Sequence, residues 1–218
     1  MAKVEPELTE FVRAAIEKAG LRLDEVADKA REIIVFGSRA AGVHSPNSDL
    51  DLLCVTTAPG RRLKSARLDL LWLRPEIIDS PGWQGSELAG HVAAYGRWLR
   101  GPEDWKTEVF ASPAAVQKKQ RQLADRIQAL EASWLNLAPA YRRRLFTLIR
   151  RDLQRLELLR QGRPVLPTPL LDHDWERIDD PMGSLVRLLR QASNLGDKDK
   201  AHFAAHAAEL LLRATVPT

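Results

Sequence analysis

The sequence predicts an α+β fold, with a mixed sheet in the N-terminal half and a bundle of helices in the C-terminal half. Two observations carry this prediction. Three short apolar runs, each about the length of a β-strand, lie at 33–36, 49–55 and 67–73. After residue 85 the apolar residues instead recur at the three- and four-residue spacing of amphipathic helices. We therefore expect an αβ core over 1–112 and a C-terminal helical bundle over 113–218.

The N-terminal half alternates helices with strands. Apolar residues at helical spacing predict a helix over 5–19, which Gly20 ends, and residues 21–29 are expected to form a second short helix or a turn. A short helix can begin after Ser38, and residues 56–62 are expected to form a turn after the second strand. This order of elements predicts a mixed αβ domain.

The C-terminal half is expected to be helical except for one connection. That connection, over 163–180, is rich in proline and is predicted to be an extended surface linker. The predicted helices cover 86–101, 113–137, 141–162, 181–194 and 198–215.

Composition limits the class of protein. Of the 218 residues, 44% are apolar, which is ordinary for a soluble globular protein, and no apolar run approaches the ~20 residues of a membrane span. The net charge of +4 is too small to indicate nucleic-acid binding by itself. The one cysteine, Cys54, excludes a disulfide framework and lies within an apolar run. We therefore expect a buried, unreactive thiol and a protein of the reducing cytoplasm, with no membrane partner.

The stretch 33–55 carries the chemistry. It reads IIVFGSRAAGVHSPNSDLDLLCV, which is an apolar strand, a Gly37-Ser38 turn, and Asp49-x-Asp51 at the head of the next strand. Residues two apart on a strand point to the same face, so the two carboxylates are expected to point at one spot. Like charges this close repel each other unless a cation lies between them. The pattern therefore predicts a site for divalent metal and a nucleoside triphosphate, where glycine allows phosphate to approach the backbone.

Asp69 is a third candidate, because it interrupts the apolar run 67–73. Burying an aspartate in a strand is costly unless it is paired or binds a metal. We therefore expect Asp69 to join Asp49 and Asp51 around Mg²⁺, which prefers hard oxygen ligands. An aspartate that faces solvent from an edge strand is the alternative.

This combination resembles the signature of the DNA polymerase β-like nucleotidyltransferase superfamily. The likeness rests on GSRAAG, on SDLDLLCV and on Asp69 in the next strand, and covers about residues 30–101. It is greatest for the small prokaryotic members, the minimal and the kanamycin-type nucleotidyltransferases. Their loop commonly reads GSRARG, whereas this chain has Ala41 where the second arginine lies. That departure affects one phosphate or acceptor contact and leaves the metal ligands intact.

The resemblance implies a mixed-sheet nucleotidyltransferase core with a two-metal site, in which Mg²⁺ is the expected metal and Mn²⁺ an alternative. The expected reaction moves a nucleoside monophosphate from a nucleoside triphosphate, with AMP from ATP as the preferred case. The expected catalytic residues and metal ligands are Asp49, Asp51 and Asp69, and the expected nucleotide-binding residues are Gly37, Ser38, Arg39 and Ser48.

The acceptor stays open at this stage. A hydroxyl of a small molecule or of a protein ranks above an RNA 3′-end, because the chain is short and only slightly basic. An RNA would use the arginines between Arg142 and Arg160, although a solvated polar face is the simpler interpretation of that helix. The alternative from another class is an antitoxin-like module that binds a partner protein through its helices. A homodimer is a further possibility.

Overall fold

The computed structural model describes residues 6–133 and 138–176. The chain divides into two compact units, one formed by Met1–Ala111 with Pro167–Pro169 and the other by Ser112–Leu166 with Leu170–Thr218. The helices predicted over 181–194 and 198–215 lie outside the described residues. Within the described ranges, no helix is long and apolar enough to cross a membrane.

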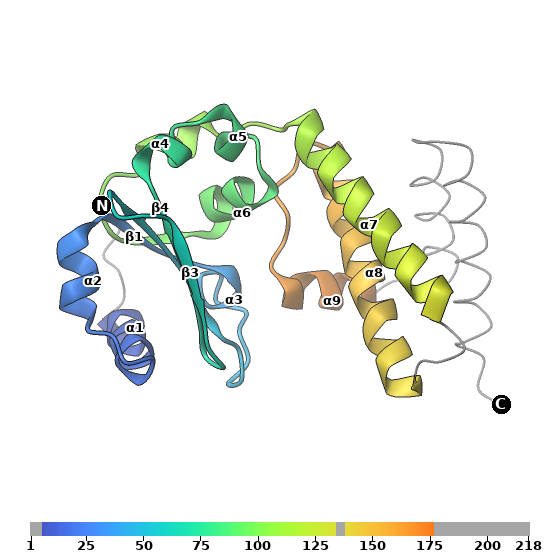
Figure 1. The fold of residues 1–218 in the computed structure, drawn as a ribbon, viewed down its shortest axis with the longest axis horizontal. Helices are drawn as coiled ribbons and strands as arrows, with labels where there is room; N and C mark the ends of the chain where they lie inside the picture. The colour runs from blue at the N-terminus through green and yellow to red at the C-terminus, as the bar shows by residue number, and fades with distance from the viewer. Residues whose placement is uncertain (1–5, 134–137, 177–218) are drawn as a thin grey trace. The chain divides into compact units, whose positions relative to one another are not determined.

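A five-stranded mixed sheet forms the centre of the first unit, which confirms the predicted α+β class (Figure 1). β2 and β4 are parallel, and the other neighbouring strands are antiparallel. The end of β1 therefore lies at the same edge of the sheet as the starts of β2 and β4. In chain order the strands are β1 (Ala30–Phe36), β2 (Leu50–Thr56), β3 (Arg61–Lys64), β4 (Leu68–Leu73) and β5 (Arg97–Arg100), and their spatial order is β3-β4-β2-β1-β5.

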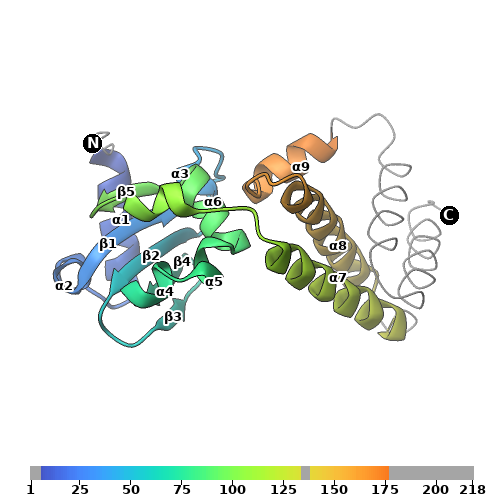
Figure 2. The same ribbon diagram turned by 90° about the horizontal axis from the view of Figure 1, so that it is seen from above.

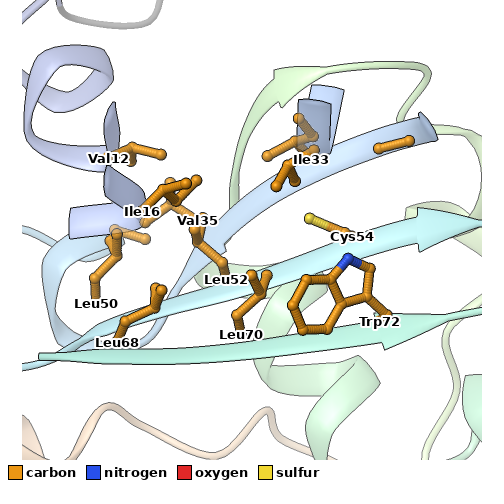
Figure 3. Packing of buried hydrophobic residues seen from close by; sticks show 13 residues of the cluster. Val12, Ile16, Ile33, Val35, Leu50, Leu52, Cys54, Leu68, Leu70 and Trp72 are labelled. Carbon is orange, nitrogen blue, oxygen red and sulfur yellow. The ribbon is translucent and has the colours of Figure 1, made fainter. Parts of the chain in front are cut away.

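One face of the sheet is covered by α1 (Pro6–Lys18) and α2 (Leu23–Lys29). Figure 3 shows Val12 and Ile16 of α1 packed over the apolar side chains of the central strands. Full burial of an aliphatic side chain such as Ile16 stabilises the fold by about 1.5–3 kcal/mol. Cys54 is buried in the same layer, and burial raises the pKa of its thiol to about 12. The thiol stays protonated, as expected for a cysteine in an apolar strand.

The opposite face packs against α4 (Pro75–Ile78), α5 (Pro81–Gln84), α6 (Glu87–Tyr95) and a 3₁₀ helix, η1 (Asp104–Glu108). Its core contains three tryptophans, Trp83, Trp98 and Trp105, whose rings meet edge-on or tilted. Trp98 and Trp105 donate their indole N–H groups to the same carboxylate oxygen of Glu32. This layer ties β1 to the segment that follows α6.

The predicted helix over 86–101 is wrong after Tyr95. α6 stops before Gly96, where the backbone becomes extended (φ −69°, ψ 147°), and residues 97–100 form β5. A Cβ at Gly96 would lie 2.4 Å from the carbonyl oxygen of Val92, so this close turn depends on glycine. Leu99 falls in helical phase with the apolar residues of α6, and for this reason the periodicity extended the helix too far.

The predicted turn over 56–62 is also wrong at both ends. The chain turns at 57–60, and β3 then pairs with β4, with Lys64 opposite Asp69. β3 carries three basic residues and one leucine, so it lacks the apolar run that identifies a buried strand. Short, charged edge strands of this kind resist pairing with other chains.

The described part of the second unit comprises α7 (Pro113–Ser133), α8 (Pro139–Arg160) and most of α9 (Thr168–Glu176). α7 and α8 lie side by side (Figure 2). The predicted extended linker over 163–180 is wrong, because α9 lies within it. Proline is tolerated in the first turn of a helix, and Pro169 is the second residue of α9.

The described arginines in the second half of α8 form ion pairs with carboxylates. Asp152 forms ion pairs with three cationic side chains although its own side chain is only 1% exposed. The interpretation of this helix as a solvated polar face is therefore wrong for this part. The pairs are Arg150 and Arg151 with Asp172, Arg160 with Glu157, and Lys119, Arg126 and Arg155 with Asp152.

Candidate active site

The end of β1 and the starts of β2 and β4 bring the predicted residues to one edge of the sheet. Asp51, the second residue of β2, lies directly opposite both Phe36, the last residue of β1, and Asp69, the second residue of β4. Directly opposite residues point to the same face of a sheet. The register therefore places both carboxylates on one face of the sheet, at the edge where α3 (Gly37–Ala40) follows β1 (Figure 1).

Gly37 contacts the Asp51 carboxylate and must be glycine for two reasons. Its φ is +74°, in the left-handed region that side chains disfavour. A Cβ at this position would also lie 2.1 Å from Oδ2 of Asp51, well inside van der Waals contact. The glycine thus lets the carboxylate approach the backbone of the turn.

α3 confirms the short helix that was predicted after the Gly37-Ser38 turn. Ser38 is half-buried, and its carbonyl oxygen accepts a hydrogen bond from the N–H of Val43. The first N–H groups of a helix have no partner within that helix. The turn therefore presents hydrogen-bond donors at the edge of the sheet where Asp51 lies.

Asp51 is a partly buried carboxylate that no cationic side chain among the described residues contacts. Its side chain makes no hydrogen bond or ion pair with any residue that the structure describes. Burial first, and then the negative charges of Asp49 and Asp69, raise its pKa to about 7. A carboxylate in this setting gains more from a bound proton or cation than one in water does.

Asp69, directly opposite, has the reverse environment. Its side chain is only 7% exposed and accepts hydrogen bonds from Arg62, with Nε at 2.6 Å from Oδ1 and Nη2 at 2.5 Å from Oδ2. Lys64 Nζ lies 3.3 Å from Oδ2. The bidentate bond with Arg62 is the main reason that the pKa of Asp69 lies below its usual value.

Arg39 holds the backbone of the loop that carries Asp49. Its side chain is largely buried, stacks over the ring of Phe11, and donates to the carbonyl oxygens of Ser48 and Asp49 at 2.6 and 3.2 Å. A phosphate contact by Arg39 would require these bonds to be given up. The Ser48 hydroxyl accepts from the N–H of Ser45, so at this position the backbone, and not the hydroxyl, meets Arg39.

The donor set suits a divalent cation of the Mg²⁺ type. Asp49 and Asp51 supply carboxylate oxygens from positions two apart, and the charge of the first raises the pKa of the second. In the part of the chain that the structure describes, no three His, Cys, Asp or Glu side chains converge as one ligand group. At Asp69, a guanidinium and an ammonium stand where a third carboxylate would meet a metal.

Arg62 and Lys64 are the residues of this edge that the sequence analysis missed. Their alternate spacing was the available signal: in a hairpin with β4, residues 62 and 64 point to the face of Asp69. The predicted turn over 56–62 includes Arg62, and Lys64 follows it in a stretch for which no strand was predicted.

Comparison with known proteins identifies the class of this site. A nucleotidyltransferase domain family matches residues 22–87, which include β1 to β4 and every predicted site residue. No curated protein matches significantly. A solved nucleotidyltransferase-like protein from Exiguobacterium sibiricum is 19% identical at a TM-score of 0.37, over 88% of this chain and 71% of that one. A toxin–antitoxin structure with AMP-PNP is 19% identical at a TM-score of 0.27, over 56% of this chain and 98% of that one.

Both structural likenesses are low, so the assignment rests on the domain match. That match includes GSRAAG, SDLDLLCV and Asp69, the features that resemble the superfamily signature. Residues 22–87 therefore form a nucleotidyltransferase domain, in agreement with the resemblance to the DNA polymerase β-like superfamily.

Proposed function

We propose that this protein transfers AMP from ATP to a hydroxyl group of a small molecule or a protein, using Mg²⁺ held by Asp49, Asp51 and Asp69. The domain match supports the class of reaction. The assignment of residues rests on the surroundings of Asp51. Its carboxylate is partly buried, lies against Gly37, and is directly opposite Asp69.

Each residue has a role that follows from its position. Gly37 leaves the turn open to phosphate oxygens, and the N–H groups at the start of α3, including that of Ser38, can donate to them. Arg39 fixes the carbonyl groups of 48 and 49, which sets where the Asp49 carboxylate enters the site. Ser48 takes part through its backbone.

The reaction makes one bond and breaks one at the α-phosphorus. The acceptor oxygen bonds to the α-phosphorus as the bond to the bridging oxygen of the pyrophosphate breaks, and the proton of the acceptor hydroxyl passes to water. A divalent cation, Mg²⁺ or Mn²⁺, would neutralise phosphate charge and lower the pKa of the attacking hydroxyl. The task of the protein is positioning, because charge is spread over phosphate oxygens throughout.

A small-molecule or protein hydroxyl is the preferred acceptor. Arg150, Arg151 and Arg155 of α8 already pair with carboxylates, which weakens the case for an RNA track along that helix. A protein partner or a homodimer is proposed in addition to the nucleotide and the acceptor. The free thiol of Cys54 favours the reducing cytoplasm as the compartment.

The test is the fate of label from ATP. The full chain is incubated with Mg²⁺, cell extract, and ATP labelled on either the α- or the γ-phosphate, with the other triphosphates as competitors. We expect α-label, and not γ-label, to enter the acceptor, because the β- and γ-phosphates leave together as pyrophosphate. Co-purification of a partner protein with no transfer of α-label would favour the antitoxin-like module instead.

A further inference from the structure

Asp69 is the carboxylate of the site that already has cations bound to it. Arg62 and Lys64 reach it from β3, while Asp51 beside it has no such contact among the described residues. The two cations are exposed, with side chains 62% and 65% accessible, whereas the Asp69 side chain is only 7% accessible. A buried anion is thus neutralised by cations that lie mostly in solvent.

The sheet register explains why these two cations reach Asp69. Lys64 is directly opposite Asp69, and Arg62, two residues earlier, points to the same face. Arg61 has the same charge and lies next in sequence, but its guanidinium stacks over Trp72, 4.2 Å from the ring centroid, on the other face. β3 therefore sends one arginine to the site and one away from it.

We propose that Arg62, assisted by Lys64, is a built-in counter-cation that holds Asp69 when no divalent metal is bound and gives up the carboxylate when one binds. This inference rests on the proposed function, because it takes Asp69 as a metal ligand. It assigns Arg62 a positioning role, since the guanidinium acts through Asp69.

The exchange follows from the unequal burial of the partners. Losing both cations would leave Asp69 buried and uncompensated, which is strongly unfavourable. Arg62 loses little when it leaves, because its exposed guanidinium is rehydrated at once. Arg62 can therefore depart only when another cation replaces it, and until then it competes with the metal. The competition makes the Asp69 side of the site weaker for metal than the Asp49 and Asp51 side.

The test is a titration of the full chain with Mn²⁺ in the absence of nucleotide. The electron paramagnetic resonance signal of free Mn²⁺ measures how much of the metal is bound. For the wild type we expect one ion bound and a second one bound much more weakly. Arg62→Gln should tighten the second ion about tenfold, the equivalent of one pKa unit of electrostatic preference. Arg61→Gln removes the same charge from the other face and should leave both affinities unchanged.

A double-mutant cycle separates this role from a merely structural one. In an Asp69→Asn background, Arg62→Gln should no longer change Mn²⁺ binding, because the carboxylate that the two cations share is gone. Thermal melting of each variant verifies that it is folded. Lys64→Gln is a second variant, and we expect it to raise the affinity for the second Mn²⁺ ion by a smaller factor than Arg62→Gln does.

The outcomes distinguish this inference from the proposed function. Wild-type Mn²⁺ binding that neither Arg62→Gln nor Lys64→Gln alters would overturn the counter-cation role and leave the metal site standing. An equal effect of Arg61→Gln would also overturn it, since general charge would then explain the result. Absence of Mn²⁺ binding by every folded variant would reject the metal site itself, and the counter-cation with it.

Discussion

β1 and β2 bury carboxylates at opposite ends of the same antiparallel pair, and the two have opposite surroundings. Glu32 is fully buried, and both of its oxygens are used: Arg31 donates to one at 3.0 and 2.7 Å, and Trp98 and Trp105 donate to the other. Asp51 is partly buried against Gly37 and receives no such bond from the described residues.

The difference separates a carboxylate that stabilises the fold from one that is available to a ligand. An unsatisfied buried acceptor costs about 1–3 kcal/mol, so a fold that needed Asp51 only for stability would surround it with donors, as it does Glu32. Instead the charges of Asp49 and Asp69 add to the cost. A bound cation would remove that cost, and this is the physical case for a metal at this edge.

The largest expected effect comes from removing a carboxylate charge at the end of the β1–β2 pair where Asp51 lies. Asp51→Asn, and equally Asp49→Asn, should lower nucleotidyl transfer by about a thousandfold or more, because a ligand for the metal and the phosphates is lost. The initial rate of α-label transfer measures this. Circular dichroism should show an unchanged fold, and near wild-type rates in either variant would remove these residues from the mechanism.

Gly37→Ala should have the next largest effect. The new Cβ would collide with Oδ2 of Asp51 and would also need a φ of +74°, so we expect transfer to fall at least about a hundredfold, with a loss of stability of about 2 kcal/mol. Gly42→Ala is the matched control, since its φ is +72° but no atom lies within 4 Å of the new Cβ. Similar losses of transfer in both variants would show that strain alone, and not the contact with Asp51, matters.

Glu32→Gln tests the buried carboxylate whose two oxygens both accept hydrogen bonds. The amide cannot accept from all four donors, so we expect the free energy of unfolding, measured in urea, to fall by about 2–3 kcal/mol. The rate of nucleotidyl transfer per folded molecule should be unchanged. Tryptophan fluorescence should report the change, because Trp98 and Trp105 lose their common acceptor. Glu76→Gln, at an exposed position of α4, is the control. A loss of transfer without a loss of stability would mean that Glu32 serves the site.

The smallest effect is the pH dependence of stability without metal. Asp51 has a pKa of about 7 in the folded chain against 3.8 in the unfolded one, so between these values the folded state binds the extra proton. Stability from this group is therefore present at low pH and is lost as pH rises through about 7, by an amount on the order of 1–2 kcal/mol once partial exposure is allowed for. Urea titrations of the wild type and Asp51→Asn at pH 5 and 8 should show the loss in the wild type alone. Parallel pH profiles would mean that Asp51 titrates normally.

The sequence was informative where one pattern determines the geometry. The cost of an aspartate in an apolar strand connected Asp69 with Asp51, and the structure has the two residues in direct register. Gly37 next to an apolar strand likewise indicated a turn that needs glycine, and the structure adds its contact with Asp51.

The sequence was misleading where partners distant along the chain decide the structure. β3 has too few apolar residues to be recognised alone and is defined by its pairing with β4. β5 shares the helical phase of α6, and only its pairing with β1 reveals a strand. Arg39 and Glu32 carry no local signal of their buried partners, so their roles could not be deduced from spacing.

The most direct measurement of the central claim is the free energy of unfolding at pH 8, with and without Mg²⁺, for the wild type and Asp51→Asn. Mg²⁺ that binds the folded chain alone stabilises it in proportion to its affinity. We predict that the metal-free variant is more stable than the metal-free wild type, and that Mg²⁺ stabilises the wild type but not the variant. Equal stabilisation of both proteins by Mg²⁺, or of neither, would contradict the assignment of Asp51 as the carboxylate that this fold keeps for a metal.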